Sequence, residues 1–116
     1  GRISITCGVG YESDLDFVQK ITTQAVEKEF PQRAMESIQF YYTGFENSSI
    51  DYILWFWTDV RDQRDVYEGR HKAILAIKKA YNQNDINIPF PIRTLDFGKN
   101  KFRSETINIE SISKDS

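Results

Sequence analysis

Alternating apolar and polar residues at the start of the chain predict its first strand. From Ile3 to Val9, every second residue is apolar and the residues between them are small or polar. This period of two is typical of a strand with one buried face. We therefore expect a strand from Arg2 to Gly10.

A helical pattern follows this strand. Between Asp14 and Pro31, apolar residues recur at spacings of three and four, which places them on one face of a helix. Ser13 and Asp14 are both favourable N-cap residues, and Pro31 cannot continue a helix because it lacks a backbone N–H. The predicted helix runs from Leu15 to Phe30.

The remaining pattern predicts a hairpin, a second helix and two short strands. Turn-forming residues at 44–49 separate two runs of strand-forming residues. After Arg61 the sequence is rich in charged residues, and apolar residues recur among them at helical spacing, which places them on one face of a helix. Pro89 and Pro91 prevent one continuous strand at the end, because each proline removes a ladder donor. The expected elements are strands Ser37–Thr43 and Ile50–Thr58, helix Asp62–Asn82, and strands Ile86–Ile88 and Ile92–Phe97.

The order of these elements indicates an α+β fold of the ferredoxin-like βαββαβ type. We expect a four-stranded antiparallel sheet with two helices on one face, plus an extra C-terminal strand. The expected organisation is a ferredoxin-like domain over residues 1–91, an assembly strand over residues 92–98 and a polar, mobile tail over residues 99–116. Many unrelated functions use this fold, so the fold alone does not define a function.

Composition narrows the class of protein. The chain has 116 residues, which is enough for one core, and its 15 Lys and Arg against 17 Asp and Glu give a net charge of −2. Nucleic-acid binding usually needs a basic face, so this charge balance argues against it. No apolar stretch approaches the roughly 18–20 residues that span a bilayer, and the single cysteine fits a reducing compartment. We expect a soluble domain in a cytoplasmic setting.

The start of the chain suggests a domain taken from a larger protein. The only methionine is Met35, and the strand pattern begins at Arg2 with no leader before it. Removal of an initiator methionine or of a tag would explain the same start.

The residues that could bind a metal or transfer protons are isolated. His71 is the only histidine and has no second histidine or cysteine at ligand spacing, so a surface histidine is the simpler interpretation. Glu12, Asp14 and Asp16 could hold a hard cation, but their spacing matches no calcium loop, and helix capping explains them. We expect no metal site and no cofactor.

Cys7, Gly8 and Gly10 also have structural explanations. Cys7 lies on the apolar face of the first strand, where burial raises a thiol pKa and lowers its reactivity. Gly8 and Gly10 resemble half of a glycine-rich phosphate loop, but no third glycine follows and no basic residue supports them, so close packing is the simpler role. We therefore expect a protein without enzymatic activity.

The third strand carries apolar residues on both faces. Alternate residues from Ile50 to Phe56 fill one face, yet Ile53, Trp55 and Trp57 fill the other. Helices on one side of the sheet leave that second face in need of a partner. A contiguous aromatic patch usually marks a protein interface. Stacking of RNA bases is an alternative, which the acidic balance and the lack of an RNP-like run disfavour.

Four short motifs occur in order along the chain. They are Val9-Gly10-Tyr11-Glu12-Ser13-Asp14-Leu15, then Ser48-Ser49-Ile50 with Trp57, then Ala76-Ile77-Lys78-Lys79-Ala80, then Ile86-Asn87-Ile88-Pro89-Phe90-Pro91. Together they resemble the C-terminal cytoplasmic α/β domain of the small-conductance mechanosensitive channel family, and the resemblance covers Ile3 to Phe97. Two positions depart from the family pattern, because Ile92 replaces a usual glutamine and Asp85 replaces a usual glycine. These departures leave the subfamily open.

The resemblance implies a homo-heptameric channel that opens under bilayer tension and releases ions and small solutes during osmotic downshock. This domain would form the wall of the vestibule on the cytoplasmic side of the inner membrane, and only segments before Gly1 would contact the membrane. In the family, the strand after Pro-Phe-Pro joins its counterparts from other subunits in a small barrel. The candidate subunit contacts are Trp55, Trp57, Pro89, Phe90, Pro91, Thr94, Leu95 and Phe97.

The alternative is a stand-alone ferredoxin-like regulatory module that holds a small ligand or RNA on its open sheet. An enzyme of acylphosphatase type shares the fold, but the chain has no matching arrangement of arginine and asparagine.

Overall fold

Two helices and three strands make up the part of the chain that the structure describes. The structure is a computed structural model that describes residues 1–33 and 35–89. Its elements are β1 (Arg2–Val9), α1 (Leu15–Glu29), β2 (Gln39–Phe45), β3 (Ile50–Trp57) and α2 (Gln63–Gln83). Each element has the predicted type, and its ends differ from the prediction by at most two residues.

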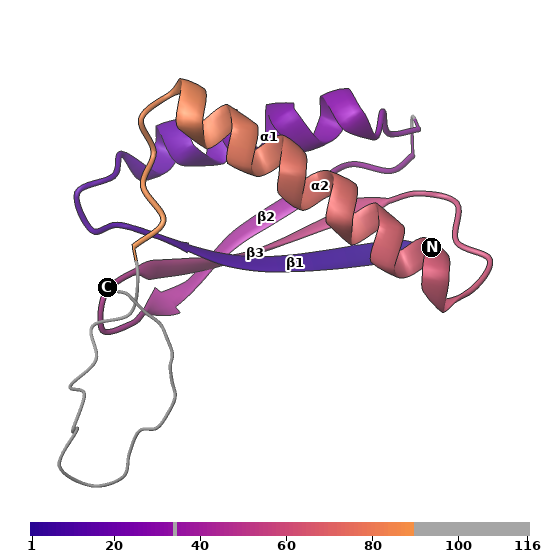
Figure 1. Ribbon diagram of the computed structural model, residues 1–116, viewed down its shortest axis with the longest axis horizontal. Helices are drawn as coiled ribbons and strands as arrows, with labels where there is room; N and C mark the ends of the chain where they lie inside the picture. The colour runs from indigo at the N-terminus through magenta and orange to yellow at the C-terminus, as the bar shows by residue number, and fades with distance from the viewer. Residues whose placement is uncertain (34, 90–116) are drawn as a thin grey trace, which may run out of the picture.

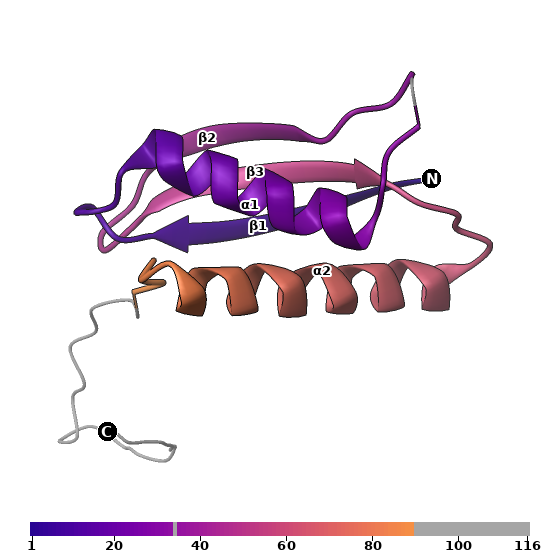
Figure 2. The same cartoon turned by 90° about the horizontal axis from the view of Figure 1, so that it is seen from above.

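The three strands form one antiparallel sheet. β3 is central, with β1 on one side and β2 on the other. Both helices lie on the same side of the sheet, which leaves the opposite face without a helical layer (Figure 1). In the view from above, α2 lies beyond β1 on the side away from β3 (Figure 2). The predicted α+β class and the two helices on one face are confirmed.

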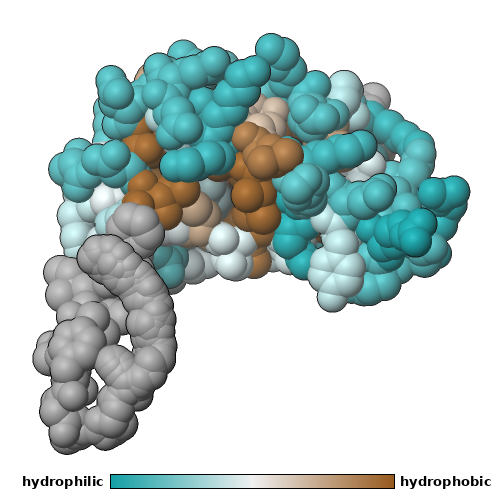
Figure 3. All heavy atoms as spheres, viewed as in Figure 1, coloured by the Kyte–Doolittle hydropathy of each residue, from teal (hydrophilic) through white to brown (hydrophobic). Residues whose placement is uncertain are grey.

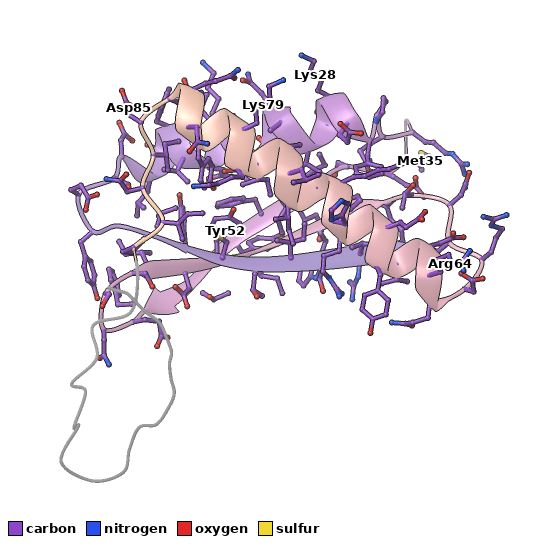
Figure 4. All side chains as sticks on the ribbon, viewed as in Figure 1. Lys28, Met35, Tyr52, Arg64, Lys79 and Asp85 are labelled. Atoms are coloured by element: carbon purple, nitrogen blue, oxygen red, sulfur yellow. The ribbon has the colours of Figure 1, made fainter. Side chains whose placement is uncertain are left out.

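The core lies between the sheet and the two helices. Alternate residues of β3 from Ile50 to Phe56 are buried, as the period of two predicts. Figure 4 shows Tyr52 on the side of the sheet that faces the helices. The helices contribute buried side chains at helical spacing, which are Val18, Thr22 and Val26 from α1 and Gly69, Ala73, Ile77 and Tyr81 from α2.

A chain of hydroxyl groups crosses this core. The Tyr81 hydroxyl lies 2.5 Å from Thr22 Oγ1 and 2.8 Å from the Tyr52 hydroxyl. Thr22 in turn donates to the Val18 carbonyl oxygen at 2.6 Å. Buried hydroxyls cost stability unless they are paired, so these contacts fix α1, α2 and β3 relative to one another.

Aspartates cap both helices. Asp14 accepts hydrogen bonds from the backbone N–H groups of Asp16 and Phe17, at 3.1 and 3.2 Å. Asp62 accepts from the N–H of Asp65 at 3.2 Å. Each cap satisfies N–H groups that have no partner within the helix, which explains where the helices begin. Of the two predicted cap residues, Ser13 and Asp14, Asp14 is the one that caps α1.

α2 ends in a left-handed turn. Asp85 has a φ of 56°, the only positive φ at a non-glycine position among the described residues. This turn lets the Ile86 N–H donate to the Tyr81 carbonyl oxygen at 3.0 Å, and Ile86 is itself buried. Such a bond is typical of a helix C-terminus that closes with a left-handed residue.

The predicted fourth strand is not present in the described part of the chain. Residues Ile86–Ile88 are not a strand, and the sheet there has three strands rather than four. The Ile86 N–H is used by the turn after α2, and the segment gives β1 only one backbone bond, from the Gly10 N–H to the Asn87 oxygen at 3.2 Å. Pro89 has no N–H with which to extend a ladder. The predicted fifth strand, Ile92–Phe97, lies outside the described residues.

Candidate functional site: an aromatic face of the sheet

The sheet face opposite the helices carries a row of apolar residues along β3. Ile53, Trp55 and Trp57 alternate with the buried positions of this strand and are all half-buried. Next to this row lie small or polar residues of β1, including Ser4 and Thr6. The prediction that the helices leave this face uncovered is confirmed.

Trp55 lies between two neighbours on this face. The Arg2 guanidinium carbon lies 4.8 Å from the centre of the Trp55 ring, which is the geometry of a cation–π contact. The Tyr41 ring meets the same indole edge-on, with centroids 5.9 Å apart and an interplanar angle of 64°. These contacts hold the indole in one orientation. A rigid, partly exposed indole is well suited to a protein contact.

A glutamine side chain stabilises the end of β3 beside this face. Gln32 Oε1 accepts from the Trp57 N–H at 3.0 Å, and Gln32 Nε2 donates to the Trp57 carbonyl oxygen at 3.1 Å. β2 begins only at Gln39, opposite Trp55, so no strand residue pairs with Trp57 on that side. The Gln32 amide therefore replaces a ladder partner. The local sequence pattern does not predict this contact, because it joins positions 25 residues apart.

The predicted contact residues fall at two ends of the sheet. Trp57 pairs with Arg2 at one end of β1, whereas Pro89 follows Asn87, which bonds to Gly10 beyond the other end. The described residues therefore offer two separate surfaces and not one continuous site. Of the other predicted contacts, Phe90, Pro91, Thr94, Leu95 and Phe97 lie outside the described residues.

A second exposed aromatic pair lies at the end of the sheet that is nearer Pro89. Tyr11 and Phe45 stack with centroids 6.4 Å apart and an interplanar angle of 9°, and Phe45 is 76% exposed. The Tyr11 hydroxyl donates to the Glu46 carbonyl oxygen. Residues 44–49 were predicted to form a turn, and the Tyr11–Phe45 pair was not predicted. The sequence feature that could have indicated an exposed aromatic contact is Phe45, a large apolar residue among turn-forming residues.

The residues considered as metal ligands or nucleophiles belong to different parts of the fold. His71 lies exposed on α2, and Asp14 caps α1. Burial raises the pKa of the Cys7 thiol, which disfavours the reactive thiolate. Within residues 1–33 and 35–89, no three His, Cys, Asp or Glu side chains are grouped so that they could hold a metal ion. The aromatic face is thus the best candidate for function in the described part.

Comparison with known proteins identifies this arrangement. Residues 3–88 match the family model described as the mechanosensitive ion channel MscS, C-terminal. The chain belongs to the MscS family. The match covers all five elements, so the described fold is the C-terminal domain of this family, as the four motifs predicted.

Two relatives and a solved structure agree with this assignment. The small-conductance mechanosensitive channel of Helicobacter pylori (strain UM084) is 32% identical over 95 residues, covering 77% of this chain and 32% of the relative. The uncharacterized MscS family protein BU452 of Buchnera aphidicola subsp. Acyrthosiphon pisum (strain APS) is 34% identical over 90 residues, covering 78% of this chain and 28% of the relative. The crystal structure of Helicobacter pylori MscS in its closed state matches with a TM-score of 0.69 and 29% identity, covering 87% of this chain and 39% of that chain.

The chain spans about a third of the length of the curated MscS relatives that it matches. Within the described residues, neither helix combines the length and the apolar composition that crossing a bilayer requires.

Proposed function

We propose that this chain is the cytoplasmic vestibule domain of a homo-oligomeric mechanosensitive channel and that it acts in subunit assembly. The observation that carries the proposal is the MscS match over residues 3–88 together with an aromatic sheet face that the helices leave uncovered. Large uncovered aromatic surfaces on a folded domain are typical of interfaces. Membership of a channel family favours this role over a stand-alone ligand or RNA-binding module.

The full channel would be a heptamer in the inner membrane that opens under bilayer tension. Ions and small solutes would pass through it during osmotic downshock, and the membrane-spanning segments would lie N-terminal to this domain. In that arrangement the vestibule domain does no chemistry. Its contribution is to hold the subunits together below the pore.

Two surfaces would make the subunit contacts. The first is the open face with Trp55 and Trp57, where Arg2 and Tyr41 already hold one indole in place. The second is the chain from Pro89 onward, for which the proposed contact residues are Pro89, Phe90, Pro91, Thr94, Leu95 and Phe97. Two separate surfaces suit a ring, because each subunit must contact a neighbour on either side.

The channel proposal is tested with the whole protein that contains this chain. We would express it in bacteria that lack their own mechanosensitive channels, and measure survival after osmotic downshock and the response of membrane patches to suction. Restored survival together with a suction-activated conductance is the expected result. A protein that reaches the membrane as an oligomer but gives neither would contradict tension gating.

A further inference from the structure

β1 is an edge strand with unpaired backbone groups on its outer side. Gly1 and Thr58 exchange two backbone hydrogen bonds, of 2.7 and 3.0 Å, so the odd-numbered residues of β1 face β3. The even-numbered residues therefore direct their N–H and C=O groups away from the sheet. Within the described residues, the N–H groups of Thr6 and Gly8 and the carbonyl of Thr6 have no partner.

Two contacts occupy the ends of this edge. The Gly10 N–H donates to the Asn87 oxygen at 3.2 Å, and the Ser4 carbonyl oxygen accepts from Arg70 Nε at 3.4 Å. The second distance is beyond the usual range for a hydrogen bond of this kind, so the contact is weak. Between these two positions the edge is open over about two residue pairs.

The chain directly after Asn87 cannot fill this gap. If it ran back along β1 from the Gly10–Asn87 bond, Pro89 would fall opposite Gly8 and Pro91 opposite Thr6. In an antiparallel ladder these are the positions at which both residues must donate an N–H. Proline has none, so two successive ladder bonds would be lost.

α2 places one exposed apolar side chain near the open edge. Arg70 contacts Ser4, and Ile74 lies one helical turn further along the same helix face. Four helical residues rise about 6 Å and two strand residues about 6.6 Å, which places Ile74 near the level of Thr6. Ile74 is 49% exposed, and Figure 3 shows apolar surface on this side of the molecule near the middle of α2.

We infer that a later, proline-free segment of the same chain, residues 105–111, adds to β1 as an antiparallel strand beneath α2. The sequence there is Glu-Thr-Ile-Asn-Ile-Glu-Ser, which alternates with a period of two. Adding a strand to an open sheet edge satisfies the backbone groups and removes an edge that is otherwise prone to pair with other chains.

The apolar side chains of this segment suit the helix side of the sheet, and its polar side chains suit the open face. With Asn108 opposite Thr6, Ile107 and Ile109 fall on the helix side, where Ile74 is exposed. In the same register Glu110 lies opposite Ser4 and within diagonal reach of Arg2 on the open face. Charge and apolar pattern therefore favour this register over a slip by one residue, which would exchange the two faces.

Connectivity favours the same copy of the chain. The 16 residues from 90 to 105 can span about 50 Å when extended, which exceeds the length of β1, so the segment can return to the edge from the Gly10 end. A connection of this length keeps the segment at an effective concentration in the millimolar range. It also leaves residues 92–98 between the two attached parts and free to contact other subunits.

Amide hydrogen exchange of the full chain, measured residue by residue by NMR, tests this inference. The Asn108→Pro variant removes the N–H that would bond to Thr6, and the matched Asn108→Ala variant retains it. Because residue 108 lies outside the described elements, neither change should disturb the fold. We expect the Thr6 and Gly8 amides to exchange about tenfold or more slowly in the unmodified chain and in Asn108→Ala than in Asn108→Pro, at every protein concentration.

Two results would overturn the inference. Equal exchange of Thr6 and Gly8 in the unmodified chain and in Asn108→Pro would mean that the segment does not pair with the edge. Protection that grows with protein concentration would mean that a second copy supplies the strand. Neither result affects the channel proposal, which concerns the open face and the proposed contact residues between Pro89 and Phe97.

Discussion

Asp85 is the one non-glycine residue with a positive φ among the described residues. Its φ of 56° lies in the left-handed region, which glycine adopts freely and other residues adopt at a cost. Aspartate tolerates this region better than most residues because its short polar side chain can bond locally. The turn is nevertheless required, since it brings the Ile86 N–H to the Tyr81 oxygen and buries Ile86. Figure 4 shows Asp85 at the point where the chain leaves α2.

Replacing Asp85 should therefore change stability in a direction that depends on the new residue. We expect Asp85→Gly to raise the free energy of unfolding by about 0.5–1 kcal/mol, because glycine relieves the backbone cost. Asp85→Ala should lower it by a similar amount, since alanine tolerates a positive φ less well than aspartate. Urea denaturation of the three proteins measures both changes. An Asp85→Ala protein as stable as Asp85→Gly would show that the turn is not strained.

The helices and the sheet are joined by the hydroxyl chain in the core. Burial raises the pKa of Tyr81 to about 12, from a usual value of 10.0, and it raises the pKa of Tyr52 as well. A tyrosine with a raised pKa holds its proton more tightly in the folded state than in the unfolded state. Its contribution to stability is complete below pH 10, and it is lost as the pH rises through the folded pKa.

Alkaline conditions should therefore weaken the packing of α1 and α2 against β3 and so destabilise the fold. We expect the free energy of unfolding to fall by about 2–3 kcal/mol between pH 10 and pH 12 through Tyr81 alone. Tyr81→Phe should make this decline shallower. At neutral pH the same variant should lose about 1–3 kcal/mol, because Tyr52 and Thr22 each lose a hydrogen-bond partner. Urea denaturation at several pH values measures the decline. A free energy of unfolding that does not change from pH 10 to pH 12 in the unmodified chain would argue against a buried, hydrogen-bonded tyrosine cluster.

At the scale of elements, the local sequence pattern predicts an element correctly where one face of that element is buried. The period of two in β1 and β3 and the capping residues Asp14 and Asp62 are local features, and these four elements begin within one residue of their predicted starts. The predicted fourth strand is wrong because the Ile86 N–H bonds to Tyr81 in the turn after α2 and Pro89 has no N–H with which to extend a ladder. The first of these contacts depends on how α2 ends, which the local strand pattern does not show. Gln32 was missed for a related reason, since its partner Trp57 becomes adjacent only after the sheet has formed.

At the scale of the whole molecule, the sequence predicted the uncovered face but not its separation from Pro89. Alternation along β3 shows that Trp55 and Trp57 share a face, because that is a local property. The distance between this face and Pro89 depends on strand register, which places Trp57 and Asn87 at opposite ends of β1. A ring of identical subunits would use these two surfaces for different contacts.

This separation allows the open face to be tested without touching the second surface. Trp55→Ala removes an indole that Arg2 and Tyr41 hold in place, and the loss of these contacts should cost the isolated domain only about 1 kcal/mol. Tyr67→Ala is the matched control, because Tyr67 is an aromatic residue that is 60% exposed and belongs to α2, which lies on the other side of the sheet.

In the full-length protein, we expect Trp55→Ala to weaken subunit association about tenfold or more, since tryptophan is enriched among the residues that dominate interface energy. Tyr67→Ala should leave association unchanged. Mass photometry of the detergent-solubilised protein over a dilution series measures the fraction of complete rings for each variant. If both variants dissociate at the same concentration as the unmodified protein, the aromatic face does not hold the ring together.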